Sequence, residues 1–129
     1  MKKIVTVIII TAIMLLTLVS CNTVDVSDAD MIKINYDYEG TRVSAEVDAN
    51  NAKVIVNNVH GCKIVKDAPE EAKFVDGVYF ELSGTRFYID INGGEAVKVD
   101  DKGYIYVEKY KLEAMMAVFQ TYGVDPYMQ

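Results

Sequence analysis

Apolar and polar side chains alternate along residues 31–38 and again along residues 42–48. A period of two residues is typical of a strand with one face in the core and one in water. Between the two runs stands Glu39-Gly40, which fits a two-residue hairpin turn. The register set by this turn pairs apolar residues on the inner face: Tyr36 with Val43, Ile34 with Ala45, and Ile32 with Val47. On the outer face the same register pairs opposite charges, Asp37 with Arg42 and Lys33 with Glu46. A single register therefore explains the residues on both faces.

A second hairpin is predicted around Ser83-Gly84, where the same turn chemistry stands between two apolar runs. The register places four apolar residues on the inner face, as the pairs Phe80–Phe87 and Val78–Ile89. Four residues then face outward, as the pairs Glu81–Arg86 and Tyr79–Tyr88.

Two further turns continue this hairpin into a meander. We expect Gly93-Gly94-Glu95 to form a three-residue loop that sets Ile91 beside Val97 and Asp90 beside Lys98. A last turn at residues 100–103 leads to a strand at residues 104–107, whose register the sequence leaves open.

Two segments have the period of a helix. Asp48 can cap the first and Gly61 can end it, and its apolar stripe consists of Ala52, Ile55, Val56 and Val59. Because residues 54–56 are all β-branched, a strand is the alternative for this segment. The second helix ends at Gly123 and Pro126, and its stripe consists of Leu112, Met115, Met116, Phe119 and Tyr122.

The predicted order is hairpin, helix, polar loop, four-strand meander and helix, with the loop at residues 67–76. Strands and helices that do not alternate strictly indicate an α+β domain. We therefore expect an antiparallel sheet of about six strands in hairpins, with two helices packed on one face. A chain of 129 residues fits a single such domain, at residues 31–125.

The first twenty residues have the pattern of an export signal. Met1-Lys2-Lys3 precedes an uncharged apolar run that ends in Leu18-Val19-Ser20-Cys21. This ending resembles the lipobox of bacterial lipoproteins. The resemblance implies a diacylglyceryl group on Cys21, cleavage before it and acylation of the new amine, with palmitate as a typical acyl chain. The alternative is an uncleaved anchor helix, since the next charge is Asp25.

Both alternatives place the rest of the chain outside the cytoplasm on a membrane, either at the bacterial surface or in the periplasm. Residues 21–30 are then the lipidated cysteine and a short polar tether. When Lys2 and Lys3 leave with the signal, 11 of the 13 basic residues remain against 19 acidic ones, a net charge of −8. This charge argues against nucleic acid as a partner. One thiol remains, Cys62, so no internal disulfide is expected.

The predicted domain resembles small bacterial lipoproteins of unassigned function. The matching features are the first hairpin, the helix ending at residues 58–61, the segment from Val78 to Ile91 and the last helix ending at residues 121–123. Those relatives often carry cysteines where this chain has Ala68-Pro69-Glu70 and Asn92-Gly93-Gly94. The resemblance therefore implies a fold and a location, but neither a disulfide nor an activity.

Three groups of residues carry side chains of the kinds found in reactive sites. His60-Gly61-Cys62 is more typical of a helix end than of a metal site, because zinc needs about four such ligands. The acidic turn at residues 100–103 lacks the third carboxylate and the closing Glu of a calcium loop. A hydrolase would need two carboxylates spaced across a cleft, and the predicted registers instead set Glu81 and Asp90 beside cationic partners, while Glu95 and Glu108 are scattered. We expect no catalytic residue, no metal and no cofactor.

The nine tyrosines are the least routine feature of the composition. Tyr79 and Tyr88 are expected to be exposed on the outer face, where an aromatic pair can contact a sugar or a protein, or can simply stabilise the sheet. We therefore expect a non-enzymatic binding or accessory module for a protein, peptide or glycan. An inhibitor or immunity-type protein that blocks a basic enzyme is the alternative, and a small enzyme is disfavoured.

Overall fold

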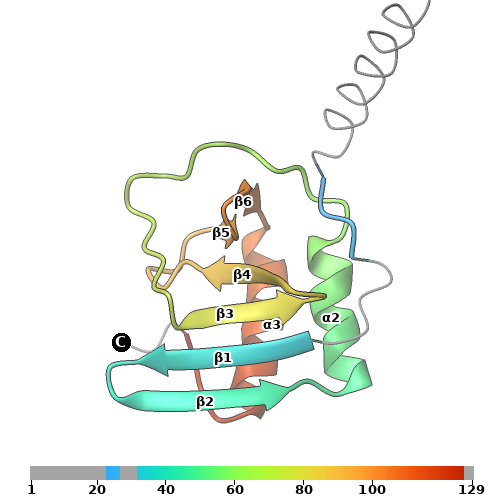
Figure 1. The fold of residues 1–129 in the computed structure, drawn as a ribbon, viewed down its shortest axis with the longest axis vertical. Coiled ribbons are helices and arrows are strands. Elements are labelled where there is room, and N and C mark those ends of the chain that lie inside the picture. The colour runs from blue at the N-terminus through green and yellow to red at the C-terminus, as the bar shows by residue number, and fades with distance from the viewer. Residues whose placement is uncertain (1–22, 27–31, 127–129) are drawn as a thin grey trace, which may run out of the picture.

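The computed structural model describes residues 23–26 and 32–126, which form a six-stranded sheet and two helices (Figure 1). The strands are β1 (Ile32–Tyr38), β2 (Thr41–Glu46), β3 (Val78–Leu82), β4 (Thr85–Ile89), β5 (Ala96–Val99) and β6 (Gly103–Tyr106). Their spatial order is β2-β1-β3-β4-β5-β6, and every neighbouring pair is antiparallel. The predicted α+β class is confirmed.

Both predicted two-residue hairpins form in the expected register. Glu39 and Gly40 have φ values of 50° and 84°, and Ser83 and Gly84 have 48° and 84°. Positive φ at both central positions is the signature of a type I′ turn, whose twist matches that of the flanking strands. Tyr36 lies opposite Val43 as expected. Glu81 lies opposite Arg86, also as expected.

The pairing of β1 with β3 joins the two hairpins into one sheet. It sets Ile34 opposite Phe80 on the inner face and Asn35 opposite Tyr79 on the outer face. Because 31 residues separate the end of β2 from the start of β3, no local turn encodes this contact. The pairing of β1 with β3 is therefore not predicted by the sequence pattern.

The predicted register between β4 and β5 is wrong by two residues. Ile89 lies opposite Val97 and Tyr88 opposite Lys98, so neither Ile91 nor Asp90 has the expected partner. Asp90 is only 2% exposed. Its Oδ1 accepts hydrogen bonds from the backbone N–H groups of Lys73 and Asn92, at 3.0 and 2.9 Å. The carboxylate therefore caps the loop between the strands. A shift of two residues leaves each side chain on its predicted face.

The helices α2 (Ala49–Val59) and α3 (Lys109–Thr121) cover one face of the sheet (Figure 1). Asp48 caps α2 as predicted, accepting a hydrogen bond from the backbone N–H of Asn51 at 2.9 Å. Gly61 follows with φ 82° and Gly123 with φ 92°, as expected at helix ends. The apolar stripes of both helices and the inner face of the sheet form a single core.

The chain just after the predicted lipid site packs against the domain. Val24 and Val26 are 5% and 9% exposed. The N–H of Val24 donates to the carbonyl oxygen of Cys62 at 2.9 Å, and its own carbonyl oxygen accepts from the N–H of Gly61 at 2.7 Å. Residues 23–26 therefore form a docked segment where a free polar tether was expected, because its two valines reach the core. The rest of the predicted tether, Cys21 and the export signal lie outside the described residues.

No helix of the described part of the chain is long and apolar enough to cross a bilayer.

Candidate functional site

The outer face of the sheet is the face that the helices leave uncovered, and it faces the viewer in Figure 1. The predicted pair Tyr79 and Tyr88 lies there. The two residues are cross-strand partners on β3 and β4. Their ring centroids are 5.6 Å apart and the rings are inclined by 58°. The alternation of the two strands thus places both tyrosines on the predicted face, in contact with each other.

The expectation that both tyrosines are exposed is wrong for Tyr79. This residue is 6% exposed, whereas Tyr88 is half-buried. No helix buries Tyr79, because α2 and α3 lie on the opposite face (Figure 1). Its cover comes from neighbouring side chains: the guanidinium carbon of Arg86 lies 4.5 Å from the ring centroid, and the Tyr88 ring lies beside it. Tyr79 therefore lies beneath its neighbours, and Tyr88 is the tyrosine of the pair that a partner can contact.

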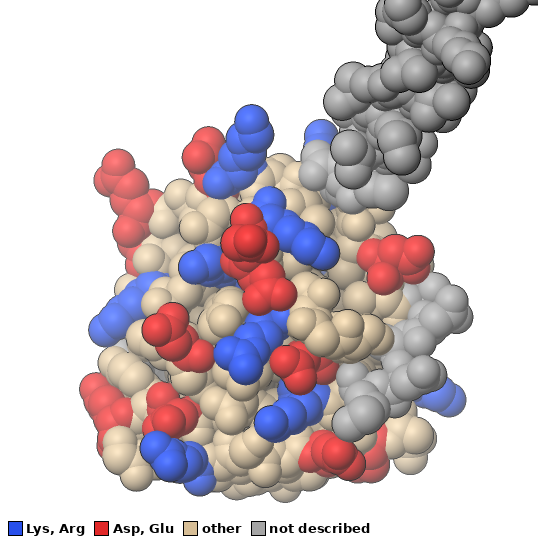
Figure 2. Space-filling view, viewed as in Figure 1, with Lys and Arg blue, Asp and Glu red and all other residues tan. Residues whose placement is uncertain are grey.

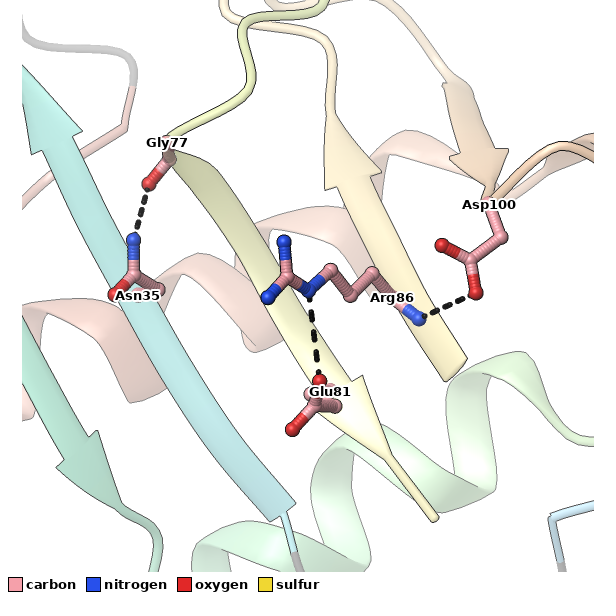
Figure 3. Close-up of polar contacts among 5 residues, drawn as sticks. All are labelled: Asn35, Gly77, Glu81, Arg86 and Asp100. Atoms are coloured by element: carbon pink, nitrogen blue, oxygen red, sulfur yellow. Dashed lines mark hydrogen bonds and ion pairs between the residues drawn. The ribbon is translucent and has the colours of Figure 1, made fainter. Parts of the chain in front are cut away.

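Arg86 is the polar centre of this face (Figure 3). Its Nε donates to the Glu81 carboxylate at 3.5 Å, and its backbone N–H donates to Oδ2 of Asp100 at 3.2 Å. A side-chain hydrogen bond to Tyr88 is the main cause that raises the pKa of Arg86, and the nearby Tyr79 raises it further. The side chain stays charged, and its guanidinium lies over the ring of Tyr79.

Asn35 fixes the neighbouring strand on the same face. Its Nδ2 donates to the carbonyl oxygen of Gly77 at 2.8 Å, immediately before β3 begins (Figure 3). A Cβ at Gly77 would collide with the carbonyl oxygen of Asp37, so only glycine permits this close approach of the two chain segments.

A shallow hollow of about 320 Å³ adjoins the tyrosines over β5 and β6. Its lining combines three lysines, two aspartates, a glycine and a tyrosine: Lys66, Lys98, Asp100, Asp101, Lys102, Gly103 and Tyr104. Lys98 connects it to the tyrosine pair, because its Nζ lies 5.7 Å from the centroid of the Tyr88 ring. Tyr104 packs on Phe74 of the long loop, with ring centroids 5.6 Å apart.

The hollow could not be predicted from the sequence. From the sequence, Lys98 is expected beside Asp90, and Tyr104 begins a strand whose register is left open, so neither residue is assigned to a site. The missing signal was the position of the loop. Backbone hydrogen bonds in both directions between Val65 and Tyr104, at 2.7 and 2.8 Å, hold the start of the loop against β6. No local pattern in the sequence encodes that contact.

Charges of both signs are interspersed over the outer face, and Figure 2 shows no broad region of one sign there. The net charge of the chain therefore does not appear as an acidic patch on this side. A surface of this kind offers donors and acceptors at fixed positions, which favours recognition by matched polar groups over attraction by net charge.

His60 and Cys62 lie at the end of α2, where each has a local hydrogen-bond partner. Nδ1 of His60 accepts a hydrogen bond from the backbone N–H of Val26 at 3.1 Å. The Cys62 thiol donates to the carbonyl oxygen of Asn58 at 3.6 Å, and burial raises its pKa. Both side chains serve the local structure. Within residues 23–26 and 32–126 no three His, Cys, Asp or Glu side chains are grouped so that they could hold a metal ion.

Among the other acidic residues, Asp90 and Asp100 have structural partners. Asp90 caps its own loop, and Asp100 accepts from the Arg86 backbone in the turn after β5. Glu108 is the residue before α3 but makes no capping hydrogen bond through its side chain.

Comparison of the chain with family models, with curated proteins and with solved structures gives no match. The outer face, with Tyr88, Lys98 and the hollow beside Tyr104, is therefore the candidate site that the geometry itself supplies.

Proposed function

We propose that this protein is a lipid-anchored extracytoplasmic module that binds a protein, peptide or glycan through the outer face of its sheet. The observation that carries the proposal is the arrangement of Tyr88, Lys98 and Tyr104 on three adjacent strands beside the hollow of about 320 Å³. Paired strands fix the backbone positions of these three residues, so less has to be ordered when a partner binds.

The anchor in this proposal is Cys21, at the end of the lipobox-like Leu18-Val19-Ser20-Cys21. Two or three acyl chains suffice for stable membrane attachment. The docked segment supports the proposal, since its first described residue, Thr23, lies two positions after Cys21. A lipid on Cys21 would thus hold the folded domain close to the membrane surface, without a long flexible linker.

The chemistry of the surface favours a neutral or mixed polar partner. Tyr88 offers a half-buried aromatic ring, on which a sugar ring or an apolar side chain can stack. Lys98 and the aspartates of the hollow offer hydrogen bonds of both kinds. An inhibitor of a basic enzyme would use a broad acidic surface, and the interspersed charges of the outer face do not favour that alternative (Figure 2).

A capture experiment tests the proposal. The chain from Asn22 onward is immobilised and exposed to envelope proteins and to glycans of the source cell. A Tyr88→Ser, Lys98→Ser double variant should fold normally and lose at least tenfold in retained partner. Tyr110→Ser is the matched control, because Tyr110 is 64% exposed on α3, on the opposite side of the molecule. Equal capture by the wild type and both variants would contradict the proposed site.

A further inference from the structure

The two edges of the sheet differ in how they are protected. At β6, Val65 pairs with Tyr104 through backbone hydrogen bonds, and the Tyr106 hydroxyl donates to the carbonyl oxygen of Asp67 at 3.0 Å. At β2, no described segment pairs on the outer side of the strand (Figure 1). An open edge of this kind carries a row of unpaired backbone donors and acceptors.

The hydrogen-bond phase of β2 identifies the residues that face the open edge. The N–H of Val47 donates to the carbonyl oxygen of Ile32 at 2.9 Å, so odd-numbered residues of this run direct their backbone groups toward β1. In an antiparallel pair the direction alternates with every residue. The backbone groups that point outward therefore belong to Arg42, Ser44 and Glu46, and all three residues are exposed.

The sequence of β2 is complementary to itself about Ser44. If a second β2 lies antiparallel with Ser44 opposite Ser44, then Arg42 of each copy stands opposite Glu46 of the other on the outer face. On the inner face Val43 stands opposite Ala45 in the same way. In this register Ser44 pairs with Ser44 and Arg42 pairs with Glu46. These are the residues whose backbone groups point toward the open edge, so both pairs can form backbone hydrogen bonds. One register thus satisfies the hydrogen bonds, the apolar face and the charges together.

We infer that β2 is the interface of a symmetric dimer in which two copies of this chain share one continuous sheet. The pairing is isologous, so the same residues serve both sides and the assembly closes at two copies. Arg42 and Glu46 make this register favourable and oppose the pairing of unrelated strands, as charges on edge strands commonly do. The docked segment does not block the edge, because it lies beside the end of α2 and away from β2 (Figure 1). The inference does not depend on lipidation of Cys21.

Charge-reversal variants test the dimer. Sedimentation velocity of the whole chain in mild detergent should show a concentration-dependent dimer for the wild type. Arg42→Glu alone sets Glu opposite Glu46, and Glu46→Lys alone sets Lys opposite Arg42, so each variant should weaken the dimer at least tenfold. An equimolar mixture of the two variants restores opposite charges at both positions and should form a heterodimer. Lys53→Glu on the exposed side of α2 has the same change of charge as Arg42→Glu and should dimerise like the wild type.

Recovery in the mixture cannot arise if the variants merely unfold, so the test separates a lost interface from a lost fold. A Ser44→Cys variant checks the register, because Cα atoms about 5.5 Å apart in a hydrogen-bonded pair lie within the range that a disulfide spans. It should cross-link on mild oxidation, whereas a Thr121→Cys control should not. A wild type that stays monomeric up to roughly 1 mM would overturn the inference and leave the edge to an extended segment of another protein. So would a dimer that neither charge reversal weakens.

Discussion

Replacing Val24 by alanine probes the docked segment directly. The change removes two buried methyl groups, which at about 0.8 kcal/mol each amounts to about 1.5 kcal/mol of lost burial. Docking as a whole is close to balanced. Burial of the two valines contributes about 3–6 kcal/mol and three hydrogen bonds contribute about 1.5–4.5 kcal/mol, while ordering the four residues costs about 4–8 kcal/mol. The midpoints of these ranges leave a net gain on the order of 1–2 kcal/mol, so Val24→Ala should nearly undock the segment.

This near balance gives a prediction about additivity. Val24→Ala should lower the free energy of unfolding by about 1–2 kcal/mol, and adding Val26→Ala should lower it by much less than a second such step. Urea unfolding of the chain from Asn22 onward, followed by circular dichroism, measures both changes. Thr23→Ala is the control, since Thr23 is exposed. If Val24→Ala changes the midpoint no more than Thr23→Ala does, the segment is not docked and the reasoning fails.

Three further predictions concern the rest of the domain. Gly40→Val should destabilise more than Arg42→Ala in chemical denaturation, because Gly40 has φ 84°, whereas the 3.3 Å ion pair of Arg42 is solvent-exposed. Equal effects would mean that the turn is misplaced. Cys62→Ser should cost about 1–2 kcal/mol without removing binding, and stoichiometric zinc that is lost in this variant would contradict the structural role. The hydrogen bond from the Asn51 backbone lowers the pKa of Asp48 in the folded protein. The charged Asp48 therefore stabilises the fold fully above its unfolded-state pKa, which is near 3.9. This stabilisation is lost as the pH falls through the lower pKa of the folded state. Urea midpoints measured down to pH 2 should therefore fall more steeply for the wild type than for Asp48→Asn, and parallel curves would refute the cap.

Local features of the fold could be predicted from the sequence because each is encoded within a few residues. Glu39-Gly40 sets a turn, and alternation on both sides of it sets the register, so the first hairpin follows from adjacent residues. Asp48 likewise marks the start of α2. The register between β4 and β5 could not be obtained in this way. It depends on Asp90 binding the backbone of Lys73, which is 17 positions away, and a local loop rule has no means of including that partner.

In the candidate site, too, the local features could be predicted from the sequence and the features that depend on distant residues could not. Alternation assigned Tyr79 and Tyr88 to one face and made them cross-strand partners, and both assignments are confirmed. Exposure depends on what lies above a residue, and here the cover of Tyr79 is the long side chain of Arg86 folded back over the ring. The hollow beside Tyr104 depends in turn on the loop after α2. Alternation along a strand determines the face on which a side chain lies. The exposure of that side chain depends on which other side chains cover it in the folded protein.

The proposed membrane anchoring depends on lipidation of Cys21. The protein, expressed from its full sequence in a bacterial host, is extracted from membranes with detergent, and its intact mass is compared with that of a Cys21→Ala variant. We expect a mature chain that begins at Cys21 and carries a diacylglyceryl group and an N-acyl chain, and a variant that carries neither. A wild-type mass equal to the unmodified chain, whether or not the signal is removed, would contradict it.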